Sequence, residues 1–110
     1  MGKFVKGDVV VVPFPFSDLS ASKHRPAFVV TALTGDDIIL CQITSRATGD
    51  TYAIHLGTND FVEGNLNQES NIRPNRLFTA DSKIIRYKAG ALKQAKIREV
   101  IERIIQIING

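Results

Sequence analysis

The apolar residues of this chain change their spacing once, and that change limits what the chain can fold into. Up to residue 81 they occur in short β-branched or aromatic runs separated by turn residues, which is typical of strands. From Ile97 to Ile108 they follow the 3.6-residue helical spacing, with charged residues on the other side. Several strands followed by one amphipathic C-terminal helix predict a mainly β fold, a small β-barrel or curled sheet with a helix packed on it.

The predicted strands are residues 9–12, 26–31, 38–44, 52–56 and 76–81, with 84–87 as an extension or partner of the last. Val9–Val12 is expected to be buried on both faces, because four consecutive valines leave no polar side. The turn signal Gly35-Asp36-Asp37 predicts that residues 26–31 and 38–44 form a hairpin. Residues 17–24, 45–50 and 57–68 are predicted loops.

Length and composition narrow the class of protein. A chain of 110 residues predicts a single domain, residues 1–110. The longest apolar run, Val9–Phe16, is far shorter than the ~20 residues of a membrane span, so no membrane association is expected. Cys41 is the only cysteine, which excludes an internal disulfide and favours a reducing cytoplasm. We expect Cys41 itself to be a small buried apolar residue.

The net charge of +3 is unevenly distributed. Residues 1–60 hold five Lys or Arg and six Asp or Glu, whereas residues 61–110 hold nine and five. A basic half is compatible with an anionic partner such as nucleic acid. The charged face of the C-terminal helix accounts for much of this excess, so charge alone favours a solvated surface.

The candidate site lies where the predicted hairpin opens. Arg25 begins one strand and is followed by Pro26, and Thr44 ends the other strand, so the two should lie close together. A guanidinium and a hydroxyl suit a phosphate, although a solvated arginine and a strand-end threonine are common without any function. The histidines, His24 and His55, lie in separate segments and no glycine-rich phosphate loop is present. We therefore expect no metal and no cofactor.

Several motifs then follow one another along nearly the whole chain. They are GDVVVVPFPFSDLS at 7–20, KHRPAFVV at 23–30, CQITS at 41–45, SNIRPNRLFT at 70–79, and GAL at 90–92 before the closing helix. In this order and spacing the chain resembles the MazF/PemK family of toxins from type II toxin–antitoxin systems. The resemblance implies an SH3-like, partly open barrel, as in CcdB, MazF and PemK.

The resemblance also implies a function, an mRNA interferase. Such a toxin is a sequence-specific, metal-independent endoribonuclease that cuts single-stranded RNA. The 2′-hydroxyl attacks the adjacent phosphorus, giving a 2′,3′-cyclic phosphate and a 5′-hydroxyl end. Two alternatives stay open: a non-catalytic SH3-like binding module, and a CcdB-like gyrase poison of the same fold. CcdB-like toxins end in Trp-Gly-Ile, whereas this chain has no Trp and ends in Asn109-Gly110.

The motif positions assign roles to individual residues. The resemblance implies that Arg25 and Thr44 act at the scissile phosphate. The general base is less clear, because residues 17–24 contain no Glu and the PemK-type aspartate is Asn75 here. We expect His24 to fill this role, since its unperturbed pKa is ~6.5. The predicted RNA-binding residues are Arg73, Ser45, Arg46, Arg76 and Asn75.

The resemblance implies partners as well, a homodimer and a cognate antitoxin. Phe14, Phe16, Phe61 and Ile72 lie in or beside predicted loops, so some of them should be exposed in a monomer and covered in a dimer. The antitoxin is expected to cover Arg25 and Arg73 with an acidic, disordered segment that folds as it binds.

Overall fold

The computed structural model of the chain describes residues 4–14, 23–46 and 49–110. The strands are β1 (Asp8–Phe14), β2 (Lys23–Ala32), β3 (Asp37–Thr44), β4 (Ile54–Leu56), β5 (Phe61–Gly64), β6 (Ser70–Asp81) and β7 (Tyr87–Leu92). Two short 3-10 helices, η1 (Thr58–Asp60) and η2 (Ser82–Ile84), interrupt them, and the chain closes with α1 (Gln94–Asn109). The predicted mainly β fold with one C-terminal helix is therefore confirmed.

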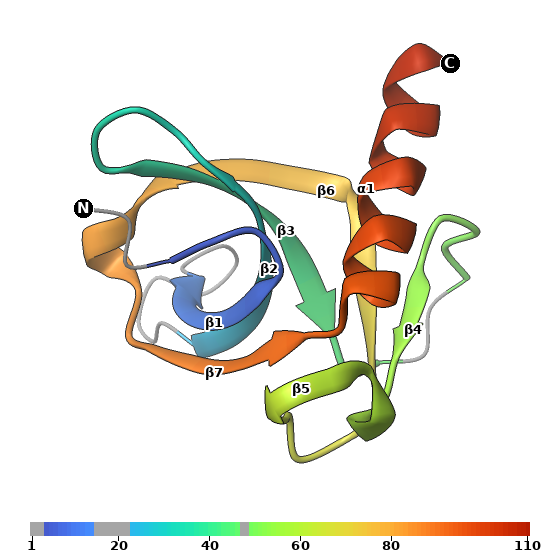
Figure 1. The fold of residues 1–110 in the computed structure, drawn as a ribbon, viewed down its shortest axis with the longest axis horizontal. Helices are drawn as coiled ribbons and strands as arrows, with labels where there is room; N and C mark the ends of the chain where they lie inside the picture. Colours follow the sequence, from blue (N-terminus) through green and yellow to red (C-terminus); the bar gives the residue numbers. More distant parts are fainter. Residues whose placement is uncertain (1–3, 15–22, 47–48) are drawn as a thin grey trace.

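One antiparallel sheet holds all seven strands, in the order β4-β6-β3-β2-β1-β7-β5. Its edge strands, β4 and β5, are consecutive in the chain and joined only by residues 57–60. A connection this short spans at most roughly 18 Å, so the two edges must approach each other and the sheet must curl. Figure 1 shows the curled sheet with α1 standing beside β6.

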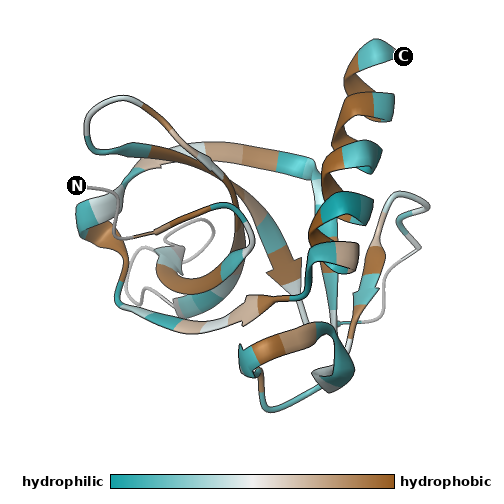
Figure 2. Cartoon of the chain, in the orientation of Figure 1, coloured by the Kyte–Doolittle hydropathy of each residue, from teal (hydrophilic) through white to brown (hydrophobic). Residues whose placement is uncertain are grey.

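Apolar side chains fill both faces of the curled sheet. On one face Phe28, Ile43 and Ile72 pack with the buried helix residues Ile97, Val100 and Ile104. On the other face Val10, Val12, Ala27, Val29, Ile38 and Leu40 pack together. Val9–Val12 are at most 6% exposed, which confirms the prediction of a strand buried on both faces. Figure 2 shows brown, apolar stretches along the sheet and both brown and teal on α1.

The Gly7-Asp8 pair has a structural role at the start of β1. Gly7 has a φ of 95°, and a Cβ there would lie 2.2 Å from Cδ1 of Ile97 on α1. Asp8 is 2% exposed and accepts a hydrogen bond from the Val5 N–H, while Lys88 lies 3.4 Å from its carboxylate. Gly7 therefore allows α1 to approach the start of β1 closely, and the contacts of Asp8 hold the start of this strand in place.

The predicted hairpin of β2 and β3 is confirmed, but several predicted boundaries are wrong. β1 continues through Pro13, because β7 no longer pairs there and the missing N–H is needed by no neighbour. β2 begins at Lys23, inside the predicted loop 17–24, of which residues 17–22 lie outside the described residues. β4 is shorter than predicted, and β7 replaces the suggested strand 84–87.

Two strand segments lie in regions predicted as loops or left unassigned. β5 falls within 57–68, and β6 begins at Ser70 rather than at residue 76. Pro74 concealed the start of β6, and it lies in a bulge between Arg73 and Leu77 where no ladder bond is required.

Some of the four apolar residues in or beside predicted loops were expected to be exposed in a monomer, and the two whose side chains the structure describes are buried. Phe61 and Ile72 are buried, whereas the side chains of Phe14 and Phe16 lie outside the described structure.

Cys41 is fully buried, as predicted, and burial raises the pKa of its thiol. Within the described residues, no helix has the length and apolar character needed to cross a membrane.

Candidate nucleic-acid interface

The open end of the β2–β3 hairpin carries Arg25 and Thr44. The last paired residues of the two strands are Ala27 and Gln42, and Arg25 and Thr44 each lie two residues farther on. Because side chains alternate along a strand, both lie on the face that carries Ala27 and Gln42. The structure thus brings the two predicted site residues to the same end and the same face of the hairpin.

The same sheet face continues across β6 and β4. Thr44 pairs with Asn71, and Asn71 pairs with His55, so these three side chains form a polar row across three strands. Gln42 pairs with Arg73 in the neighbouring row. Antiparallel neighbours lie about 4.5–5.5 Å apart, so this row presents one polar group per strand.

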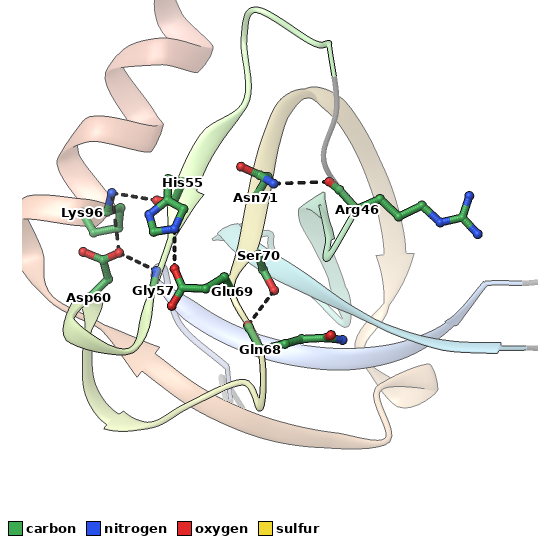
Figure 3. Close-up of polar contacts among 9 residues, drawn as sticks. All are labelled: Arg46, His55, Gly57, Asp60, Gln68, Glu69, Ser70, Asn71 and Lys96. Carbon is green, nitrogen blue, oxygen red and sulfur yellow. Dashed lines mark hydrogen bonds and ion pairs between the residues drawn. The ribbon is translucent and has the colours of Figure 1, made fainter.

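Two hydrogen bonds hold the turn that follows Thr44. The Arg46 backbone N–H donates to the Thr44 hydroxyl at 3.2 Å, and the Asn71 side-chain amide donates to the Arg46 carbonyl at 3.3 Å. The Thr44 oxygen acts here as an acceptor, so its own hydrogen is available for another oxygen. Figure 3 shows the Arg46 side chain reaching away from β6, and it is exposed.

A pocket of about 320 Å³ opens beside Arg25. Arg25 and His24 both border it, as does Ser45 after the end of β3. Residues 66–68, which precede β6, and Tyr87 at the start of β7 also line it. Thr44 is not among the residues that line this pocket, because it lies on the other face of β3.

Arg25 has no side-chain hydrogen bond or ion pair to another residue in the part of the chain that the structure describes. It is half-buried and lies next to an exposed histidine, His24. Since no carboxylate of the described residues pairs with Arg25, its guanidinium can bind an anion there.

Arg73 has a different environment, because its Nε lies 3.1 Å from the Asp50 carboxylate. The side chains are 21% and 9% exposed respectively, so this is a largely buried ion pair. Asp50 also accepts a hydrogen bond from the Tyr52 N–H at 2.9 Å and one from the Asn75 side chain. The Tyr52 N–H and then Arg73 lower the pKa of Asp50, although burial opposes them.

Two further predicted RNA-binding residues, Asn75 and Arg76, do not line the pocket beside Arg25. Arg76 lies in the β6 bulge and is exposed, and Asn75 beside it is also exposed. The predicted roles of these residues, and of Arg73 and Arg46, stay predictions.

The structure also reveals polar groups that the sequence did not single out. His55 Nε2 lies 2.5 Å from Glu69 Oε1, and both side chains are about two-thirds exposed. A Cβ at Gly57 would lie 3.2 Å from the Glu69 carboxylate and 3.3 Å from the His55 ring, so the glycine leaves room for the pair. Asp50, Gln68 and Tyr87 were also missed, because their contacts join segments far apart in the chain. Figure 3 shows the His55–Glu69 pair and the Lys96 bond to the His55 carbonyl.

Comparison with known proteins assigns the chain to a family. The profile of the PemK-like, MazF-like toxins of type II toxin–antitoxin systems matches residues 5–108. The chain belongs to this family. The family resemblance inferred from the motifs is thereby confirmed, whereas no curated protein sequence gives a match to the chain.

Solved structures of MazF toxins share the fold. The MazE–MazF complex from Deinococcus radiodurans superposes with a TM-score of 0.77 at 17% identity, over 96% of each chain. The Mycobacterium tuberculosis toxin MazF-mt6 gives 0.71 at 15% identity, over 93% of this chain and 96% of the other. A mycobacterial endoribonuclease bound to its cognate antitoxin gives 0.75 at 11% identity, over 96% and 95%. At these identities the likeness confirms the MazF-like barrel.

Proposed function

We propose that this toxin is a sequence-specific, metal-independent endoribonuclease that cuts single-stranded RNA, and that Arg25 and Thr44 act on the scissile phosphate. The observation that carries the proposal is the open end of the β2–β3 hairpin. There an arginine without an ion-pair partner among the described residues and a strand-end hydroxyl share one face of the sheet, and the arginine also borders a pocket whose lining does not include the threonine. Membership of the MazF/PemK family supports this assignment.

In the proposed reaction the 2′-hydroxyl of the RNA attacks the adjacent phosphorus. The bond from phosphorus to the 5′-oxygen breaks, which leaves a 2′,3′-cyclic phosphate and a 5′-hydroxyl. Negative charge grows on the non-bridging oxygens in the transition state, and the Arg25 guanidinium stabilises it. Thr44 donates its hydroxyl hydrogen to one of these oxygens, while its own oxygen keeps the Arg46 N–H.

A base must take the proton of the 2′-hydroxyl, and the leaving 5′-oxygen must gain one. We assign the first step to His24, which is exposed and borders the same pocket as Arg25, and the leaving 5′-oxygen takes its proton from water. An imidazole exchanges protons near neutral pH, whereas an arginine does not.

The decisive experiment is a cleavage assay on a mixed-sequence RNA in EDTA, followed by mapping of the ends. We expect cuts at a short recurrent sequence with 5′-hydroxyl ends, because a guanidinium supplies the positive charge. The Arg25→Ala variant, purified in parallel, controls for contaminating ribonuclease. Cleavage that requires an added metal, or equal cleavage by the variant, would refute the proposal.

We also propose an antitoxin-binding surface, an oligomeric state and a cellular location for the toxin. Its cognate antitoxin should bind over Arg25 with an acidic segment, since two of the structural neighbours above were solved with an antitoxin. The toxin should form a homodimer, and exposed isoleucines on α1, Ile105 and Ile108, are apolar surface that a dimer could cover. It should act in the cytoplasm, where messenger RNA is translated.

A further inference from the structure

The pocket beside Arg25 has an apolar floor. Val11 of β1 and Ile43 of β3 are at most 6% exposed, and Pro26 and Leu66 complete the floor. Its volume of about 320 Å³ is within the range of small-molecule pockets. Apolar side chains therefore form the buried bottom of the pocket, whereas polar groups form most of its exposed lining.

The walls of the pocket combine aromatic rings with neutral hydrogen-bonding groups. The aromatic rings belong to His24 and Tyr87, and Tyr87 is 59% exposed. The neutral groups are the amides of Asn67 and Gln68 and the hydroxyl of Ser45. Aromatic faces and amide groups are the two kinds of side chain with which proteins stack and read bases of single-stranded RNA.

The chain between β5 and β6 is held so that its amides, not its carboxylate, border this pocket. The Ser70 hydroxyl donates to the Gln68 carbonyl at 3.1 Å. Glu69, between these two residues, is turned toward His55 and pairs with it. Figure 3 shows the Gln68 side chain extended away from the His55–Glu69 pair. No carboxylate borders the pocket among the described residues, so an RNA strand meets no like charge there.

We propose that this pocket binds one nucleobase of the RNA substrate, next to the phosphate held by Arg25, and that Gln68 and Tyr87 determine which base is accepted. The inference rests on the proposed endoribonuclease function. Tyr87 stacks on the base, and the Gln68 amide hydrogen-bonds its edge. Arg25 belongs to both sites, because it borders the pocket and lies at the open end of the hairpin.

The first test compares cleavage maps of wild-type toxin, Gln68→Ala and Asn65→Ala on the same mixed-sequence RNA. Asn65 is the matched control, an exposed amide in the same connection that does not line the pocket. Loss of a base-specific amide contact should reduce discrimination at one position of the cleavage sequence by about 5- to 150-fold. The Asn65→Ala map should equal that of the wild type.

The second test measures KM and kcat on one short RNA substrate for Tyr87→Ala and Tyr87→Phe. Stacking is lost in the alanine variant, so KM should rise by about 5- to 150-fold there, whereas the phenylalanine variant keeps the ring and should recover most of the wild-type KM. Binding of a 2′-O-methyl analogue, which cannot be cleaved, should weaken by the same factor. Both residues have exposed side chains, and circular dichroism spectra should confirm that the variants are folded.

Failure of this inference is distinguishable from failure of the proposed function. If wild-type toxin cuts RNA but Gln68→Ala cuts the same sequence and Tyr87→Ala keeps its KM, the pocket does not bind a base. If wild-type toxin cuts no RNA and the 2′-O-methyl analogue does not bind, both the endoribonuclease proposal and the base-pocket inference are wrong.

Discussion

Arg25 and Arg73 lie on the same face of one sheet, on the two strands that flank β3, yet their surroundings differ. Arg73 forms a largely buried ion pair with Asp50, which is itself held by the Tyr52 N–H. Arg25 has no such partner among the described residues and borders a pocket. An arginine already paired with a buried carboxylate must give up that pair to bind a phosphate, whereas one without a partner among the described residues need not. The position of an arginine in a family motif does not by itself show whether it forms an internal ion pair or binds a ligand.

The Arg25→Ala variant should have the largest effect and tests whether Arg25, unlike Arg73, binds the substrate. We expect cleavage to fall by at least ~1,000-fold, because the developing charge on the phosphate loses the Arg25 guanidinium. The unfolding midpoint in urea should change little, since no interaction with another described residue is lost. Arg98→Ala, which removes an exposed arginine of α1, is the matched control and should retain full activity.

Thr44→Ala should have the next largest effect. Removing one hydrogen-bond donor to a developing oxyanion costs about 2.7–4 kcal/mol, so kcat should fall by roughly 100- to 1,000-fold. Thr44→Ser keeps the hydroxyl and should recover most of the rate. An alanine variant with wild-type kcat would show that the hydroxyl only accepts the Arg46 N–H.

Asp50→Asn should weaken the fold rather than the chemistry. It leaves Arg73 without its carboxylate, and the free energy of unfolding at pH 7 should decrease by about 2–3 kcal/mol. The pKa of Asp50 is lowered in the folded state, so its contribution is present above the unfolded pKa of ~3.9. As the pH falls through the lower folded pKa, this contribution disappears.

Urea unfolding of wild type and Asp50→Asn at pH 7 and at pH 3 measures this dependence. The difference between the two proteins should be largest at pH 7 and should shrink at pH 3. A difference that stays constant with pH would mean that the carboxylate charge contributes nothing to stability.

Local patterns predicted those parts of the molecule that depend on neighbours in sequence. Four consecutive valines identified β1, and the helical spacing identified α1. The β2–β3 hairpin has a short turn, so its open end, with Arg25 and Thr44, followed from the strand assignments. By contrast, Val62 is the only β-branched residue of β5, and this strand forms because β7 pairs with it.

The parts of the site that were missed depend on long-range pairing. Asp50 reaches Arg73 only because β6 returns beside β3, 23 residues later in the chain. Asp81 and Glu69 lie closer to Arg73 in the sequence, but Asp81 accepts the Lys83 N–H and Glu69 pairs with His55. Tyr87 joins the pocket because β7 pairs with β1, which no local signal indicates.

The smallest expected effect separates the two arginines by the salt dependence of RNA binding. Each phosphate contact to a single strand contributes about −0.7 to the slope of log affinity against log salt. For a 2′-O-methyl RNA analogue, Arg25→Gln should therefore make the slope less steep by about 0.7. Arg73→Gln should change it less, because Asp50 already matches the charge of Arg73. Equal changes in the two variants would show that Arg73 leaves Asp50 to meet a phosphate, in agreement with the motif-based prediction.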